Sequence, residues 1–478
     1  MKVETSVSLP DRAAVNSMVD ALVHRARAAQ AVVNAYSQPQ VDELVLAVGW
    51  AIMEPQRNQE SAELAVLDSG VGNVADKVRK NHRKTLGLLR DLQHAPSVGV
   101  IAVDETKGIV EIARPVGVVC AVTPSTNPAA TPANKIINAV KGRNAVIVAP
   151  SPKGWSTCAR LLEHIHAQFD RIGAPRDLVQ MLPSPISKAS TQALMQACDL
   201  VVATGSQANV RSAYTCGTPA FGVGAGNVAS IIDETADTRR VAELIRSSKT
   251  FDNATSCSAE NSVVVVDAVR GAMLAALEAV GAVLLTHEQA RQLERTMWPD
   301  GKLSSAVIGQ NATLIAERAG LPEVAALKPR ILMVEESRVG PDAPFSGEKL
   351  SPVLTVYTAA HFEDAIHIVE RIYAHQGAGH SVSLHSQSEE RALQLGVRLP
   401  VSRVIVNQAH AIATGGSFDN GLPFSLSMGC GTWGKNNFSE NMNYRHYLNI
   451  TRISKPIAER VPTEAEVFGA FFDKYGRT

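Results

Sequence analysis

Apolar positions recur with two different periods along the 478-residue chain. From Asp11 to about His94 they recur every three or four residues, which predicts amphipathic helices, and Leu9-Pro10-Asp11 offers a helix start signal. From Pro115 onward, short continuous apolar runs alternate with segments of helical period. Buried strands separated by helices in this way predict an α/β fold with a parallel, doubly wound sheet.

The first sheet is the best defined part of this pattern. Strands are predicted at 116–122, 145–149, 178–182 and 200–203, with helices at 129–141 and 155–169. Ligands bind at the carboxyl ends of such strands. The loops Thr123-Pro124-Ser125-Thr126-Asn127-Pro128 and Thr204-Gly205-Ser206 leave two of these ends and are therefore candidate ligand-binding loops.

A β-hairpin is predicted between the helical region and this sheet. Val98–Val103 and Ile109–Ala113 have strand character, and a polar turn that ends in Gly108 joins them. A lone two-stranded hairpin is marginal in water, so it must pair with another part of the chain or with a second subunit. We expect an interface between subunits.

Cys257 is the candidate nucleophile. It lies among small polar residues from Thr250 to Ser262, directly before the apolar run Val263–Val266. A thiol on a loop beside a rigid strand is a common place for a catalytic nucleophile. The alternative is a small buried cysteine that only fills space in a core.

Composition narrows the class of partner. The chain has 46 basic and 46 acidic residues, so its formal net charge is zero, which argues against nucleic acid and against an anionic membrane surface. The first ten residues lack an apolar core of signal-peptide length, and no run of about 18 apolar residues occurs, so we expect a cytoplasmic protein. Six scattered cysteines without zinc-like spacing predict reduced thiols and no metal.

Six segments together resemble the aldehyde dehydrogenase superfamily, in particular the CoA-acylating branch that includes acetaldehyde and succinate-semialdehyde dehydrogenases. The resemblance extends from about Gln30 to Lys455. The segments are 123–128, 204–206, 222–227, Phe251-Asp252-Asn253 with Cys257, 348–353 and 429–434.

The resemblance implies a domain arrangement. It places a nicotinamide cofactor domain at 1–97 and 117–228, a catalytic domain at 229–434, and a β oligomerisation arm with the C-terminal tail at 98–116 and 435–478. A strand predicted at 447–453 would join the hairpin of a neighbouring subunit, as it does in the superfamily. A homodimer or homotetramer is implied.

Cys257 corresponds to the nucleophile of the family. Its thiolate would add to an aldehyde carbonyl, and Asn127 with the Cys257 backbone N–H would stabilise the oxyanion. Collapse of this adduct would pass hydride to the nicotinamide and leave a thioester. Without the resemblance, an Asx turn before Pro128 is the simpler interpretation of Asn127.

The chain lacks the general base that activates water in hydrolytic members, and this difference predicts which molecule accepts the acyl group. Hydrolytic members carry a Glu-Leu-Gly-Gly-Lys segment whose carboxylate activates water, whereas this chain has Gly222-Val223-Gly224. Water without a base is a poor nucleophile, and a thiol is far better. We therefore expect coenzyme A as co-substrate, with a hydrolytic aldehyde dehydrogenase as the alternative.

The resemblance also implies the cofactor residues. Glu348 would hold the nicotinamide ribose, and Thr204-Gly205-Ser206 would lead into the helix beneath the pyrophosphate. Because Ala149-Pro150-Ser151-Pro152 lacks the acid that grips the adenosine ribose and Lys153 follows it, NADP is slightly preferred to NAD. The predicted cofactor set is Thr123, Pro124, Ser151, Lys153, Thr204, Gly205, Ser206, Gly222, Gly224 and Glu348.

Substrate identity rests on the polar residues around the thiol. Short hydroxyl side chains favour a small anionic aldehyde, with sulfoacetaldehyde preferred and succinate semialdehyde as the alternative. Arg403 would pair with the anion or be a buried structural arginine. His380 is a possible proton carrier, although a structural histidine is favoured. The predicted substrate residues are Ser125, Ser256, Arg403 and His410, within a pocket that also holds Thr126, Thr255 and Ser258.

Overall fold

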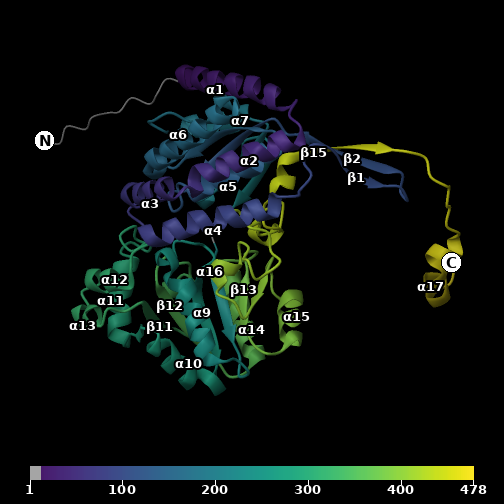
Figure 1. Cartoon of the computed structure of the whole chain (residues 1–478). Helices are drawn as coiled ribbons and strands as arrows, with labels where there is room; N and C mark the ends of the chain where they lie inside the picture. The colour runs from purple at the N-terminus through teal and green to yellow at the C-terminus, as the bar shows by residue number, and fades with distance from the viewer. Residues whose placement is uncertain (1–11, 225, 478) are drawn as a thin grey trace.

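The computed structural model describes residues 12–224 and 226–477 (Figure 1). It has two parallel sheets covered by helices and a small antiparallel sheet that projects to one side. The predicted doubly wound α/β fold with a β arm is thereby confirmed. The helix start signal at Leu9-Pro10-Asp11 and the residues before it lie outside the described part of the chain.

The helical beginning consists of α1 (Arg12–Val33), α2 (Gln38–Met53), α3 (Pro55–Ser69) and α4 (Val74–Leu92). Local chemistry sets the boundaries. The Asn73 side chain accepts a hydrogen bond from Asp76 N at the start of α4, and Gly70 ends α3 in a left-handed conformation at φ 68°. In Figure 1, α4 runs between the two parallel sheets.

The first sheet has the strand order β5-β4-β3-β6-β7, with every neighbouring pair parallel. The order reverses between β3 and β6, and ligands bind in the crevice at such a switch point. Its strands are β3 (Val118–Thr123), β4 (Ala145–Pro150), β5 (Val179–Met181), β6 (Leu200–Thr204) and β7 (Ala220–Val223), and its helices are α5 (Ala130–Lys141), α6 (Trp155–Ile172), α7 (Lys188–Ala197) and α8 (Gln207–Thr215).

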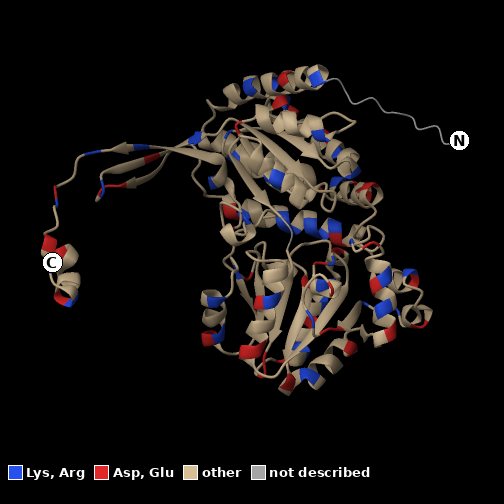
Figure 2. Ribbon diagram, turned by 180° about the vertical axis from the view of Figure 1, so that it is seen from behind, with Lys and Arg blue, Asp and Glu red and all other residues tan. Residues whose placement is uncertain are grey.

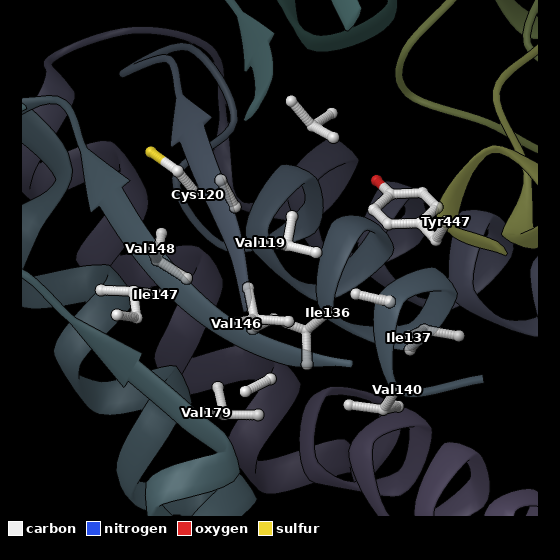
Figure 3. Packing of buried hydrophobic residues seen from close by; sticks show 14 of the residues in the cluster. Val119, Cys120, Ile136, Ile137, Val140, Val146, Ile147, Val148, Val179 and Tyr447 are labelled. Carbon is white, nitrogen blue, oxygen red and sulfur yellow. The ribbon is translucent and has the colours of Figure 1, made fainter. Parts of the chain in front are cut away.

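The core of this sheet explains why the strands appear as unbroken apolar runs. All six residues of β3 and all six of β4 are buried, because helices cover both faces. In Figure 3, Val119 and Val146 face Ile136 and Val140 of α5 across this core. Each aliphatic side chain of this kind stabilises the fold by about 1.5–3 kcal/mol relative to exposure.

The second sheet has the parallel order β10-β11-β12-β9-β8-β13-β14. Its central strand β9 follows Cys257 closely and is buried at every position. The strands are β8 (Val228–Ile232), β9 (Glu260–Val266), β10 (Ala282–Leu284), β11 (Ile331–Glu335), β12 (Val353–Ala359), β13 (Val382–His385) and β14 (Val404–Val406). The helices are α9 (Thr238–Thr250), α10 (Asp267–Ala279), α11 (His287–Met297), α12 (Ala312–Arg318), α13 (Pro322–Ala326), α14 (Phe362–His375), α15 (Glu389–Arg398) and α16 (His410–Ala413).

The packing bears on the predicted domain boundaries, which stay a prediction. The second sheet begins at Val228, whereas Phe424, Phe438 and Tyr447 pack into the core of the first sheet. The chain therefore returns to the cofactor domain before it reaches the arm.

The arm consists of β1 (Gly99–Asp104), β2 (Ile109–Pro115) and β15 (Leu448–Ser454), paired antiparallel in the order β1-β2-β15. The expectation that β15 joins a neighbouring subunit's hairpin is wrong, because it pairs with β2 of its own chain from Leu448 opposite Pro115 to Ser454 opposite Ile109. Beyond it, α17 (Glu464–Tyr475) buries no residue and lies far from the body of the molecule (Figure 1).

Asn144 accounts for this pairing within the chain. Its Oδ1 accepts hydrogen bonds from Val116 N at 2.7 Å and Gly117 N at 3.0 Å, directly after β2. Its Nδ2 donates to Tyr447 O at 2.9 Å, directly before β15. One fully buried amide thus fixes the end of β2 beside the start of β15.

Neither a membrane span nor a metal cluster is found within the described ranges. None of their helices is long and apolar enough to cross a bilayer. No group of three or more His, Cys, Asp or Glu side chains there is arranged to hold a metal ion.

We predict that Asn144→Ala detaches β15. The change leaves buried backbone groups without partners, at a cost of about 2–4 kcal/mol. Hydrogen exchange followed by mass spectrometry should show faster exchange in β15 and a lower midpoint of thermal unfolding. Asn449→Ala, which removes an exposed amide of β15 that donates to Pro115 O, is the control. Unchanged exchange in the Asn144 variant would contradict the assignment.

Candidate active site

Cys257 follows a sharply turned segment, the 3-10 helix η3 (Phe251–Ala254). Three successive residues there, Asp252, Asn253 and Ala254, have φ values of 49°, 53° and 56°. Residues other than glycine rarely adopt this left-handed conformation, and it persists only where the surroundings impose it. The contacts of Asp252 provide that constraint.

The carboxylate of Asp252 is buried between two ammonium groups from α4. Lys77 Nζ donates to Asp252 Oδ2 at 3.2 Å, Lys80 Nζ donates to the same oxygen, and Asn73 N donates to Oδ1 at 3.0 Å. Burial disfavours the charge, but the two lysines outweigh it and hold the pKa of Asp252 below its ordinary value. Figure 2 shows the basic residues of α4 between the two sheets.

Lys80 also orients Asn127. Its Nζ donates to Asn127 Oδ1 at 2.7 Å and lies 3.4 Å from Thr255 Oγ1, two residues before the thiol. Since an ammonium group only donates, the oxygen of the Asn127 amide must face Lys80. The Asn127 NH₂ group is left to donate to a reacting oxygen.

The sequence analysis missed Lys77 and Lys80. Buried lysines are uncommon, so a lysine on an amphipathic helix is normally taken to face water. The available signal was their position: Lys77, Lys80 and Lys84 recur at helical spacing on the buried face of α4.

His380 contacts the thiol. His380 Nε2 lies 3.4 Å from Cys257 Sγ, and His380 Nδ1 lies 2.7 Å from Ser381 Oγ, which is 2.8 Å from His410 Nε2. Burial, together with the charge of Arg403, lowers the pKa of His380 to about 3, so its imidazole is neutral near pH 7. The contact with the thiol fits the proton-carrier interpretation, which stays a prediction.

The electrostatics of the thiol complement this histidine. Burial raises the pKa of Cys257 to about 12, with smaller contributions from the charges of Glu348 and Cys430. Both groups are therefore uncharged in the free protein, and it is the 3.4 Å contact that places the imidazole where it could receive the thiol proton. The proton need move only when a carbonyl group is present to react.

The glycine-rich loop lies against this pair. A Cβ on Gly226 would lie 2.4 Å from Cys257 O and 3.1 Å from His380 Cδ2. A Cβ on Gly224 would lie 2.4 Å from Gln207 Nε2. These glycines are required for close approach, while Ala225 between them lies outside the described residues.

The predicted cofactor residues gather at the carboxyl edge of the first sheet. Thr123 ends β3 and Pro124 follows it, Ser151 and Lys153 follow β4, Thr204 ends β6 before Gly205 and Ser206, and Gly222 and Gly224 lie in or after β7. Ser151 N donates to Thr123 O at 3.0 Å, which joins two of these loops. Their role in cofactor binding stays a prediction.

This edge fits a nicotinamide dinucleotide. Thr123 Oγ1 is buried without a hydrogen-bond partner at the switch point. Ser206 caps α8 by accepting from Asn209 N at 3.3 Å, so the first N–H groups of α8 face the same edge. Glu348 comes from the segment before β12, and its Oε1 accepts a hydrogen bond from Gly226 N at 3.4 Å.

The predicted substrate residues have different positions. Ser125 lies in the loop after β3, and Ser256 Oγ lies 2.7 Å from Ser258 Oγ beside the thiol. The nitrogens of Arg403 donate to Asn441 Oδ1 at 2.7 Å, Gly429 O at 2.9 Å and Ser439 O at 2.9 Å, which fits the structural alternative.

His410 is fully buried rather than turned to water. Burial lowers its pKa well below the ordinary value, so the ring is neutral and offers no charge to a substrate anion. Its contact with Ser381 instead connects it to the histidine beside the thiol.

Comparisons with known proteins agree with this geometry. Residues 5–294 match the aldehyde dehydrogenase family. The chain is 65% identical over 468 residues to a sulfoacetaldehyde dehydrogenase (acylating) of Cupriavidus necator, covering 98% of this chain and 95% of that protein. It is 42% identical to a sulfoacetaldehyde dehydrogenase (acylating) of Bilophila wadsworthia, covering 95% and 98%.

The fold has a close counterpart among solved structures. The crystal structure of an acetylating aldehyde dehydrogenase from Geobacillus thermoglucosidasius superposes with a TM-score of 0.90 at 32% identity, covering 95% of this chain and 100% of that chain. The chain therefore belongs to the aldehyde dehydrogenase family, within its CoA-acylating branch.

Proposed function

We propose that the protein oxidises sulfoacetaldehyde to sulfoacetyl-CoA, with NAD(P)⁺ and coenzyme A, through a thioester on Cys257. The observation that carries the proposal is the contact between Cys257 Sγ and His380 Nε2 at 3.4 Å. Among the described residues, no carboxylate oxygen is hydrogen-bonded to that thiol. The 65% identity to an acylating sulfoacetaldehyde dehydrogenase supports the choice of substrate.

Acylation begins with proton transfer from the thiol of Cys257 to His380. The sulfur bonds to the carbonyl carbon, and the carbonyl π electrons move to oxygen, where the Asn127 NH₂ group and the Cys257 N–H stabilise the charge. The nicotinamide, when bound, accepts the hydride from that carbon. As the carbon–oxygen double bond re-forms, the acyl group remains on Cys257.

Transfer to coenzyme A uses the same histidine. Once His380 has released its proton to solvent, it is again a neutral base that can take the proton of the CoA thiol. The CoA sulfur then attacks the thioester and displaces Cys257 as a thiolate, which regains its proton from His380. Gly222 stands at the start of the segment in which hydrolytic members carry the carboxylate that activates water, and a thiol is a better nucleophile than water, so CoA is favoured as the acceptor.

The preference for NADP is part of the proposal. Ser151 and the exposed Lys153 follow β4, and no carboxylate occurs between Ala149 and Lys153 to repel a 2′-phosphate.

Assembly into a homodimer or homotetramer is also proposed. Val100 and Val103 of the arm and Val467, Phe468 and Phe471 of α17 are exposed in the single chain. Apolar surface of this extent is typical of an interface.

We predict that turnover requires coenzyme A. Without it, reduction of the nicotinamide should stop after about one equivalent per thiol, because the thioester has no acceptor. The measurement is rapid-mixing absorbance of the reduced cofactor, with sulfoacetaldehyde, succinate semialdehyde and acetaldehyde, each with NAD⁺ and NADP⁺. Sustained reduction of the nicotinamide without CoA would contradict the acylating function. A higher kcat/KM for another aldehyde would show that this aldehyde, not sulfoacetaldehyde, is the preferred substrate.

We predict that Lys80→Met lowers the rate of hydride transfer by about 10²- to 10³-fold, as loss of an oxyanion donor does. The reason is that Asn127 loses the contact that orients its amide. Alkylation of Cys257 by iodoacetamide needs no oxyanion site and should persist, which separates orientation from general disruption. Lys141→Met, which removes another buried lysine that donates to Leu92 O, is the control. Equal losses in both variants would contradict the role of Lys80.

We predict a pH-dependent effect of Glu348→Gln. Burial raises the pKa of Glu348 to about 8, so its negative charge appears above that pH, where it opposes ionisation of Cys257. Without cofactor, iodoacetamide should therefore alkylate the variant about two- to fivefold faster than wild type near pH 9.5 and equally fast below pH 7. Glu260→Gln, which removes another buried carboxyl group, should match wild type. A difference that persists below pH 7 would refute this assignment.

A further inference from the structure

Two further cations of α4 lie beyond Lys80 and have no carboxylate partner. Lys84 is buried, and its Nζ donates to Gly415 O at 2.8 Å and Gly416 O at 3.2 Å. Arg83 lies beside it. Among the described residues, neither side chain has a carboxylate oxygen within 4.0 Å.

The guanidinium of Arg83 has an unused donor. Its Nη2 donates to Ser417 Oγ at 2.7 Å, whereas Nη1 is buried without a hydrogen-bond partner. The group lies 5.4 Å from the ring centre of Phe418 and 5.6 Å from that of Phe424, which fixes its plane. The nearby carboxylate of Asp419 is exposed and accepts a hydrogen bond from Ser417 instead.

These cations lie within about one helical turn of Lys80, which contacts the oxyanion donor Asn127. Lys80 contacts the amide of Asn127, and Lys84 follows four residues later on the same buried face, about 6 Å along the helix axis. A two-carbon aldehyde whose carbonyl oxygen lies at Asn127 can therefore direct a group on its second carbon toward Lys84.

Charge indicates what kind of group belongs there. Burial, with the charges of Arg83 and Lys80, lowers the pKa of Lys84 to about 7. Burying a cation without a counter-ion costs free energy of desolvation. Binding of an anionic ligand would offset this cost, which the free protein otherwise carries. The carbonyl oxygens of Gly415 and Gly416 compensate only in part.

The absence of a side chain at Gly415 lets the loop pack closely against Lys84. A Cβ on Gly415 would lie 2.6 Å from Ser425 O and 3.0 Å from Lys84 Nζ. A side chain at position 415 would therefore clash with Lys84 Nζ and with the backbone oxygen of Ser425.

We propose that Lys84 and Arg83 form the subsite that binds the sulfonate of the substrate, an inference that rests on the proposed function. A sulfonate is ionised at all physiological pH values and presents three acceptor oxygens. Lys84 Nζ supplies a compact charge and Arg83 Nη1 a directed donor, so two oxygens are bound by different groups. This subsite replaces Arg403, whose nitrogens already donate to Asn441 Oδ1 and to backbone oxygens.

The test compares two aldehydes of similar shape. Sulfoacetaldehyde carries the sulfonate, and 3,3-dimethylbutanal carries a neutral tert-butyl group in its place. For Lys84→Met and Arg83→Met, the ratio of kcat/KM for the first aldehyde to that for the second should fall about 10- to 100-fold, mainly through KM. The control is Arg90→Met, on the same helix, whose guanidinium lies over the same two rings but pairs with Asp91. The ratio of kcat/KM for the two aldehydes should be the same in Arg90→Met as in the wild type.

A binding measurement separates this inference from the proposed function. Calorimetric titration with ethanesulfonate should show binding to wild type and to Arg90→Met, with at least tenfold weaker binding in the other two variants. If wild type does not oxidise sulfoacetaldehyde, the proposed function fails, but ethanesulfonate binding that depends on these residues still supports the anion subsite.

The subsite is overturned by an unchanged substrate ratio, or by ethanesulfonate binding that is equal in all variants. Should Lys84→Met fail to fold, Arg83→Met alone decides the outcome, because the Arg83 side chain is only half-buried and tolerates replacement.

Discussion

The carboxylate of Asp252 lies between the ammonium groups of Lys77 and Lys80, and this buried contact connects the two domains at the point where they must cooperate. Helix α4 packs into the core of the first sheet through Leu88 and Leu92, whereas Asp252 belongs to the segment that carries the thiol. Removing one member of a buried ion pair leaves an uncompensated charge, at a cost of about 3–5 kcal/mol. The same contact therefore holds the left-handed turn before the nucleophile and the lysine that orients the oxyanion donor.

The thiol and its histidine are kept uncharged by burial. A low-dielectric site disfavours an ion pair of thiolate and imidazolium until a carbonyl oxygen can receive the negative charge. Resting reactivity toward water or oxidants is thereby low, and the proposed proton transfer is coupled to attack on the aldehyde.

The sequence predicts the sheets well because strands buried on both faces, such as β3 and β4, appear as continuous apolar runs. It also singles out Cys257, because its neighbours in the sequence are small and polar, whereas a cysteine in a hydrophobic core has apolar neighbours. Contacts made by distant residues are not visible in a local pattern. His380 lies 123 positions from the thiol that it contacts, and the sequence alone favoured a structural role because structural histidines are the more common kind. The pairing of β15 with its own chain is supported by the amide of Asn144, whose contacts only the folded structure reveals.

The absence of a side chain at Gly226 has a consequence for redesign. An engineer who wants this scaffold to release a free acid would first try to graft a carboxylate onto the loop beside the nucleophile. The first carbon of any such graft at this position would collide with the peptide oxygen of Cys257, 2.4 Å away. A carboxylate at position 226 would thus require a re-routed loop backbone.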